Sequence, residues 1–136
     1  MKILFNEHPN KGFQRVGYCS YYGEIFYALE EVCEVTSSCG VPSRTSEFGS
    51  GYDAIVMGFG HTDCGDAGPM PTINDNNIPL FPILNKEYTG LKQKLEWIKN
   101  MKPTAALTVH HDTEEYSKIT GIPFHRIMWS ANENLF

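Results

Sequence analysis

Short apolar runs alternate with longer amphipathic stretches along this chain. Each run is short and closed by polar residues, glycine or proline, which is typical of a strand buried on both faces of a parallel sheet. Prolines in the fourth run favour a strand end or a sheet edge there. The predicted strands are 2–5, 34–36, 53–60, 78–84, 105–109 and 124–129.

Three intervening stretches carry apolar residues at three- and four-residue spacing, which predicts helices that pack on the sheet. We expect them to begin at Ser20, at Thr89, and at Asp112 or Thr113, with these residues as N-caps. Gly121 is expected to follow the third helix. The apolar face of the first predicted helix consists of Tyr22, Ile25, Phe26, Leu29, Val32 and Cys33. In the second predicted helix, the residues expected to face the sheet are Leu91, Leu95, Ile98 and Met101. The residues expected to face outward are Lys92, Lys94 and Glu96.

Strands that alternate with helices imply right-handed crossovers and a parallel sheet covered on both faces. We therefore predict an α/β fold: a three-layer Rossmann-like sandwich with a mainly parallel sheet of five to six strands. The length of 136 residues suits one domain, 1–136.

Composition narrows the classes of partner. Hydrophobic residues make up 41% and charged residues 20%, as in globular proteins, and the formal net charge is −5. With no Lys/Arg cluster and no apolar run near the length of a membrane span, we expect neither nucleic acid nor membrane as a partner. No C-x-x-C pair occurs among the four cysteines, so we expect neither a zinc knuckle nor a thioredoxin-like motif. Since a chain with this much core needs no disulfides, we expect reduced thiols and a cytoplasmic location.

Polar residues follow most of the predicted strands. In open α/β sheets, ligands bind beyond the carboxyl ends of the strands, near the point where the strand order reverses. This rule predicts one ligand site, provided that the turns at 58–64 and 110–112 share an edge. Its expected residues are Asn6, Glu7, His8, Gly58, Gly60, His61, Asp63, Asn85, Lys86, Glu87 and Asp112.

His110 and His111 are the candidate catalytic residues. Neutral imidazole both donates and accepts hydrogen bonds near pH 7, which suits acid–base chemistry. The alternative is that Asp112 only caps the third helix and the histidines are its neighbours.

Metal-ligand side chains occur in two groups, but their spacing matches no known signature. Two adjacent histidines on an extended chain would also point to opposite sides. We therefore expect no metal and no cofactor. The residues considered are His61, Asp63, Cys64, His110, His111 and Asp112.

Nucleotide and nucleophile motifs are incomplete. Gly58 and Gly60 begin a G-x-G-x-x-G pattern, but Asp63 stands where the third glycine belongs. No P-loop and no G-x-S-x-G sequence occurs.

The opening residues 1–5, a long loop, an amphipathic helix and then residues 52–60 (YDAIVMGFG) resemble the N-terminal Rossmann-like domain of GT-B glycosyltransferases. Residues 84–88 (LNKEY) and 107–112 (LTVHHD) resemble the glycosyltransferase-like proteins related to CgeB. The resemblance spans nearly the whole chain.

The resemblance implies a metal-independent cleft between two such domains, in which the N-terminal domain contacts the acceptor and the other holds the nucleotide sugar. Residues after Gly58 and Val109 would line it. We expect this chain to bind a sugar, glycan acceptor or nucleotide-like ligand, without catalysis by itself, and to be completed by a partner chain or a second copy. Two alternatives stay open: a small enzyme with a histidine acid–base, oriented by Glu7 or Asp112, and a non-catalytic flavodoxin-like binding module.

Overall fold

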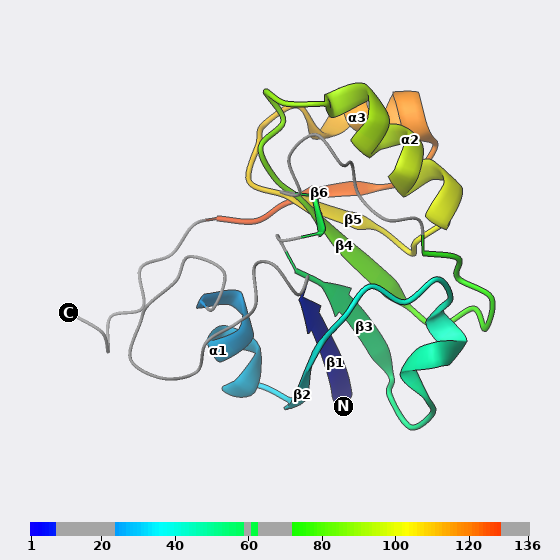
Figure 1. Cartoon of the computed structure of the whole chain (residues 1–136). Coiled ribbons are helices and arrows are strands. Elements are labelled where there is room, and N and C mark those ends of the chain that lie inside the picture. Colours follow the sequence, from blue (N-terminus) through cyan, green and yellow to red (C-terminus); the bar gives the residue numbers. More distant parts are fainter. Residues whose placement is uncertain (8–23, 59–60, 63–71, 129–136) are drawn as a thin grey trace.

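A computed structural model describes residues 1–7, 24–58, 61–62 and 72–128. Within these ranges, six strands form one all-parallel sheet in the order β2-β1-β3-β4-β5-β6 (Figure 1). The elements are β1 (Lys2–Glu7), α1 (Glu24–Glu30), β2 (Glu34–Cys39), the 3-10 turn η2 (Thr45–Phe48), β3 (Ala54–Met57), β4 (Leu80–Leu84), α2 (Leu91–Met101), β5 (Ala106–Thr108), α3 (Thr113–Thr120) and β6 (Phe124–Arg126). The predicted order of strands and helices is confirmed.

The sheet has helices on both faces, so the predicted α/β sandwich is confirmed. Successive strand side chains point to opposite faces, and β1 shows this directly. Leu4 packs in the core cluster that contains α2 and α3, whereas Ile3 and Phe5 pack in the cluster that contains Phe26 of α1. In Figure 1, α1 lies on one side of the sheet and the α2–α3 pair on the other.

Both N-terminal strands are longer than predicted. Asn6 and Glu7 are polar, yet they are the last residues of β1, because they stay in parallel register with Ser38 and Cys39 of β2. The side chains that we expected in a loop therefore belong to the sheet itself.

The helix predictions need three corrections. Val32 lies beyond the end of α1 and is 78% exposed, so it is not part of the buried stripe. Thr89 is not the cap of α2; Gly90 holds that position in the left-handed conformation, with φ of 62°. Lys94 is buried rather than turned outward. Gly121 is confirmed as the left-handed residue after α3, with φ of 74°.

Several predictions lie outside the described residues, among them Ser20, Tyr22 and Trp129. Cys33 and Cys39 are free thiols, and Cys19 and Cys64 also lie outside the described part of the chain. No helix in that part is long and apolar enough to cross a membrane.

Ile98 of α2 is fully buried in the core, whereas Ile119 of α3 is half exposed. We expect Ile98→Ala to lower the free energy of unfolding by about 2–5 kcal/mol, since the vacated space cannot refill completely. The same change at Ile119 should cost less than about 1 kcal/mol. Urea denaturation of the two variants measures the difference, and equal losses would contradict the assignment of the core.

Candidate functional site

The carboxyl ends of the strands lie along one edge of the sheet because all six run in the same direction. The strand order reverses between β1 and β3, since β2 lies on the opposite side of β1. The general rule for open α/β sheets places ligands beyond this reversal. The residues that end β1, β3, β4 and β5 are therefore the ones to examine.

Glu7 and Gly58 lie together at the reversal. A Cβ atom built on Gly58 would overlap Oε2 of Glu7 and come within 3.1 Å of the Phe5 ring. The glycine therefore leaves the space that the buried Glu7 carboxylate occupies. A backbone hydrogen bond connects the same two strands, because N–H of Gly58 donates to the carbonyl of Asn6 at 2.8 Å.

The turn after β3 is attached to the end of β4. Thr62 Oγ1 donates to the carbonyl of Ile83 and accepts from the backbone N–H of Asn85, both at 2.9 Å. His61 is buried, and its backbone N–H donates to the Gly58 carbonyl at 3.3 Å. Among the predicted site residues, Gly58, His61 and Asn85 are thus connected through Thr62.

A buried lysine stabilises the end of β4. Nζ of Lys94 donates to the carbonyls of Asn85 and Lys86, at 2.8 and 2.9 Å. Because β4 has ended, Nζ of Lys94 supplies a donor to the Asn85 carbonyl, and it shares the Lys86 carbonyl with the backbone N–H of Thr89. Lys86 takes a left-handed backbone conformation, with φ of 53°, as the chain turns toward Glu87.

Glu87 connects this turn to β5. Thr108 Oγ1 donates to the Glu87 carboxylate and accepts from the backbone N–H of His110 at 3.1 Å. The turns after β3 and β5 thus both contact the residues that follow β4. They lie on the same edge of the sheet, as the site prediction requires.

His110, His111 and Asp112 form a compact cluster at the start of α3. Asp112 Oδ2 lies 3.1 Å from Nδ1 of His110, and Oδ1 lies 3.2 Å from Nε2 of His111. The two imidazole rings stack, with centroids 4.5 Å apart and planes 20° from parallel. The expectation that the histidines point to opposite sides is therefore wrong, because the chain bends at 109–111 instead of staying extended.

Asp112 occupies the N-cap position of α3, but its side chain makes no capping hydrogen bond. A carboxylate at this position ordinarily accepts from the first N–H groups of the helix. Here it faces the two histidines instead. Asp112 therefore holds the predicted cap position through its backbone, while its side chain contacts the histidines.

Tyr116 lies behind the cluster and is 3% exposed. Its hydroxyl is 3.4 Å from Nδ1 of His110. Burial raises the pKa of Tyr116 to about 12, and nearby carboxylates add to the rise. Those carboxylates belong to Glu87, Asp112 and Glu115.

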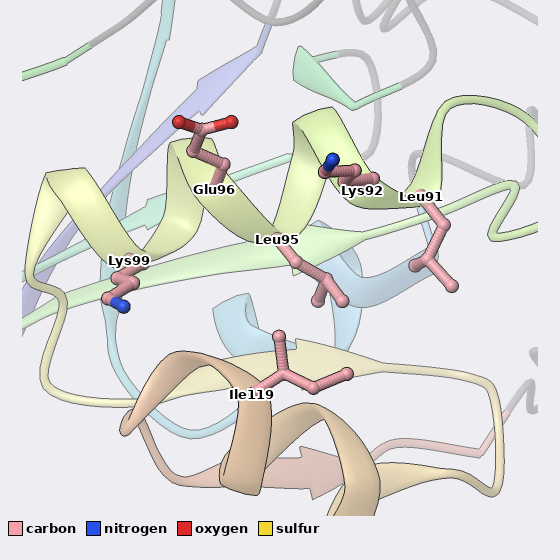
Figure 2. A pocket seen from close by; sticks show the side chains of 6 residues that line it. All are labelled: Leu91, Lys92, Leu95, Glu96, Lys99 and Ile119. Atoms are coloured by element: carbon pink, nitrogen blue, oxygen red, sulfur yellow. The ribbon is translucent and has the colours of Figure 1, made fainter.

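Two hollows adjoin these elements. A polar pocket of about 480 Å³ opens at the start of α3 and is lined by His111, Asp112, Thr113, Glu114, Glu115 and Lys118. A larger, mainly apolar groove of about 620 Å³ runs between α2 and α3, where the side chains of Leu91, Leu95 and Ile119 approach one another (Figure 2). The polar pocket includes His111 and Asp112 from the sequence prediction, whereas the apolar groove contains none of the predicted residues.

His8, Gly60 and Asp63 lie outside the described residues. The sequence analysis missed Thr62, Lys94, Thr108 and Tyr116 as parts of this edge. Lys94 had a signal, since it lies three residues after Leu91 and four before Ile98 and so shares their face of the helix. The roles of Thr62, Thr108 and Tyr116 depend on contacts between segments far apart in the chain.

Comparisons of the chain with known protein families, with curated proteins and with solved structures found no match.

We expect Gly58→Ala to lower the free energy of unfolding by about 1–3 kcal/mol, since its methyl group would displace the Glu7 carboxylate. Gly40→Ala is the matched control, because a Cβ there meets nothing within 4 Å. In a double-mutant cycle, Glu7→Ala should reduce the cost of Gly58→Ala. Purely additive urea-denaturation energies would contradict the proposed conflict for space.

The raised pKa of Tyr116 makes stability fall at high pH. Between pH 10 and 12 the unfolded tyrosine loses its proton while the folded one keeps it, so the free energy of unfolding decreases as pH rises. The wild type should lose up to about 1.4 kcal/mol per pH unit more than Tyr116→Phe in this window. Tyr88→Phe, at a side chain 83% exposed, is the control, and denaturation at stepped pH measures all three.

Proposed function

We propose that this domain binds a sugar-like, hydroxyl-rich ligand at the carboxyl edge of its sheet, and that it acts as an acceptor-binding domain of glycosyltransferase type without transferring sugar on its own. The proposal is supported by the sequence resemblance to GT-B N-terminal domains and by the polar residues along this edge. Glycan acceptors are recognised through many hydroxyl groups, each of which can donate to a carboxylate or an imidazole.

The observation that carries the proposal is the charge of the edge. Carboxylates outnumber lysines among its described side chains: Glu7, Glu87, Asp112, Glu114 and Glu115, against Lys86, Lys94 and Lys118. Lys94 already donates to two backbone carbonyls. Such an edge attracts hydroxyl donors and repels phosphates, which favours a neutral glycan over a nucleotide sugar.

A second candidate is a small enzyme in which His110 is the acid–base. The Asp112 carboxylate lies 3.1 Å from Nδ1 of His110, close enough to accept a hydrogen bond from a protonated Nδ1. That arrangement leaves Nε2 as the basic nitrogen, with the ring held in place by its neighbour. His110→Ala would then abolish turnover of a substrate and leave thermal stability close to that of the wild type.

The flavodoxin-like alternative draws on the strand order, since 2-1-3-4-5 is also the order of flavodoxin. Flavodoxins hold their flavin phosphate at the β1/β3 reversal. Glu7 places a carboxylate at that point, which disfavours a phosphate group.

Isothermal titration against neutral oligosaccharides, nucleotide sugars and flavin mononucleotide tests the proposal. We expect binding of one or more neutral oligosaccharides, and an affinity at least tenfold lower in Glu87→Gln, because a charged acceptor for a hydroxyl is lost. Glu96→Gln, at an exposed position of α2, is the matched control. Binding of flavin alone, or no binding to the folded protein across the whole panel, would overturn the proposal.

A further inference from the structure

We propose that His110, His111 and Asp112 form a binding site for a divalent transition-metal ion, with zinc as the best match. Adjacent histidines on an extended chain would diverge, which disfavours a shared metal ion. The bend at 109–111 removes that objection, since it turns both imidazoles toward the same carboxylate.

The spacing of the ligand atoms fits an ion. One atom from each of the three residues can be chosen so that all lie within 4.8 Å of one another. Zinc bonds of about 2.0–2.2 Å, at angles between about 90° and 110°, separate neighbouring ligand atoms by about 2.8–3.6 Å. Each histidine nitrogen already lies in this range from one oxygen of the Asp112 carboxylate, His110 at 3.1 Å from Oδ2 and His111 at 3.2 Å from Oδ1.

The donor set selects the class of metal. Two imidazole nitrogens and one carboxylate oxygen suit zinc, cobalt, nickel and copper, whereas magnesium and calcium prefer oxygen ligands alone. Three protein ligands also leave a coordination position open, as in zinc sites that bind water or a further molecule. A hydroxyl oxygen of a bound molecule could coordinate the ion at that open position.

The surroundings of the cluster are accessible and acidic. The His111 side chain is 73% exposed, so an ion can reach it from solvent. Glu114, Glu115 and Lys118 line the same pocket as His111 and Asp112. The carboxylates outnumber the lysine, and they offset the positive end of α3, which would otherwise repel a cation.

The inference goes beyond the proposed function and does not depend on it, because metal binding is measured without any glycan. The metal-free chain should be titrated with Co²⁺, which fills zinc sites and absorbs visible light, and with Zn²⁺ by calorimetry. We expect one ion per chain, a rise in the unfolding temperature with Zn²⁺, and no response to Mg²⁺.

Two variants and a control locate the site. His111→Ala and Asp112→Asn should each weaken Co²⁺ binding at least tenfold, whereas His125→Ala, at an exposed histidine of β6, should not. Circular dichroism checks that each variant is folded. We expect His111→Ala to fold, because the His111 side chain is exposed. No Co²⁺ binding to the folded wild type, or an equal loss in His125→Ala, would overturn the inference.

Discussion

The parallel pairing of β1 with β2 on one side and β3 on the other determines how this molecule is arranged. This pairing places β1 between β2 and β3, where the strand order reverses. It also brings the last residues of neighbouring strands to one edge of the sheet. Because both faces of such a strand are covered, its side chains are buried even where they are polar. Asn6 and Glu7 are each 1% exposed for this reason. Burying a carboxylate is costly unless it is hydrogen-bonded or paired, and Gly58 contributes only the space that this carboxylate occupies.

The apolar runs were sufficient to predict the order of the elements, because a strand covered on both faces requires uninterrupted apolar residues. They did not predict where β1 ends, since Asn6 and Glu7 remain in the strand through backbone bonds that are independent of side-chain type. The start of α2 was mispredicted for a related reason. Thr89 has the chemistry of a cap, but the chain turns at Gly90, where glycine takes the left-handed conformation without the strain that a Cβ atom would add.

The candidate site could be predicted as a set of strand ends but not as a set of contacts. The rule for open sheets located Glu87 and His110 on the same edge, yet the hydrogen bonds of Thr108 that join them follow from the pairing of β4 with β5. Asp112 illustrates the limit most clearly. Its place before α3 predicts a cap, and only the bend of the preceding residues turns its carboxylate toward the histidines.

The close approach of Gly58 to Glu7 has a consequence for how this sequence can diverge. The two positions share one volume, so a side chain at 58 requires the Glu7 carboxylate to move, and a shorter residue at 7 removes that conflict. A larger residue at 58 should therefore be found together with a shorter residue at 7, although the two positions lie 51 residues apart in the chain. Such covariation would identify the point where the strand order reverses, in any related sequence that keeps this sheet.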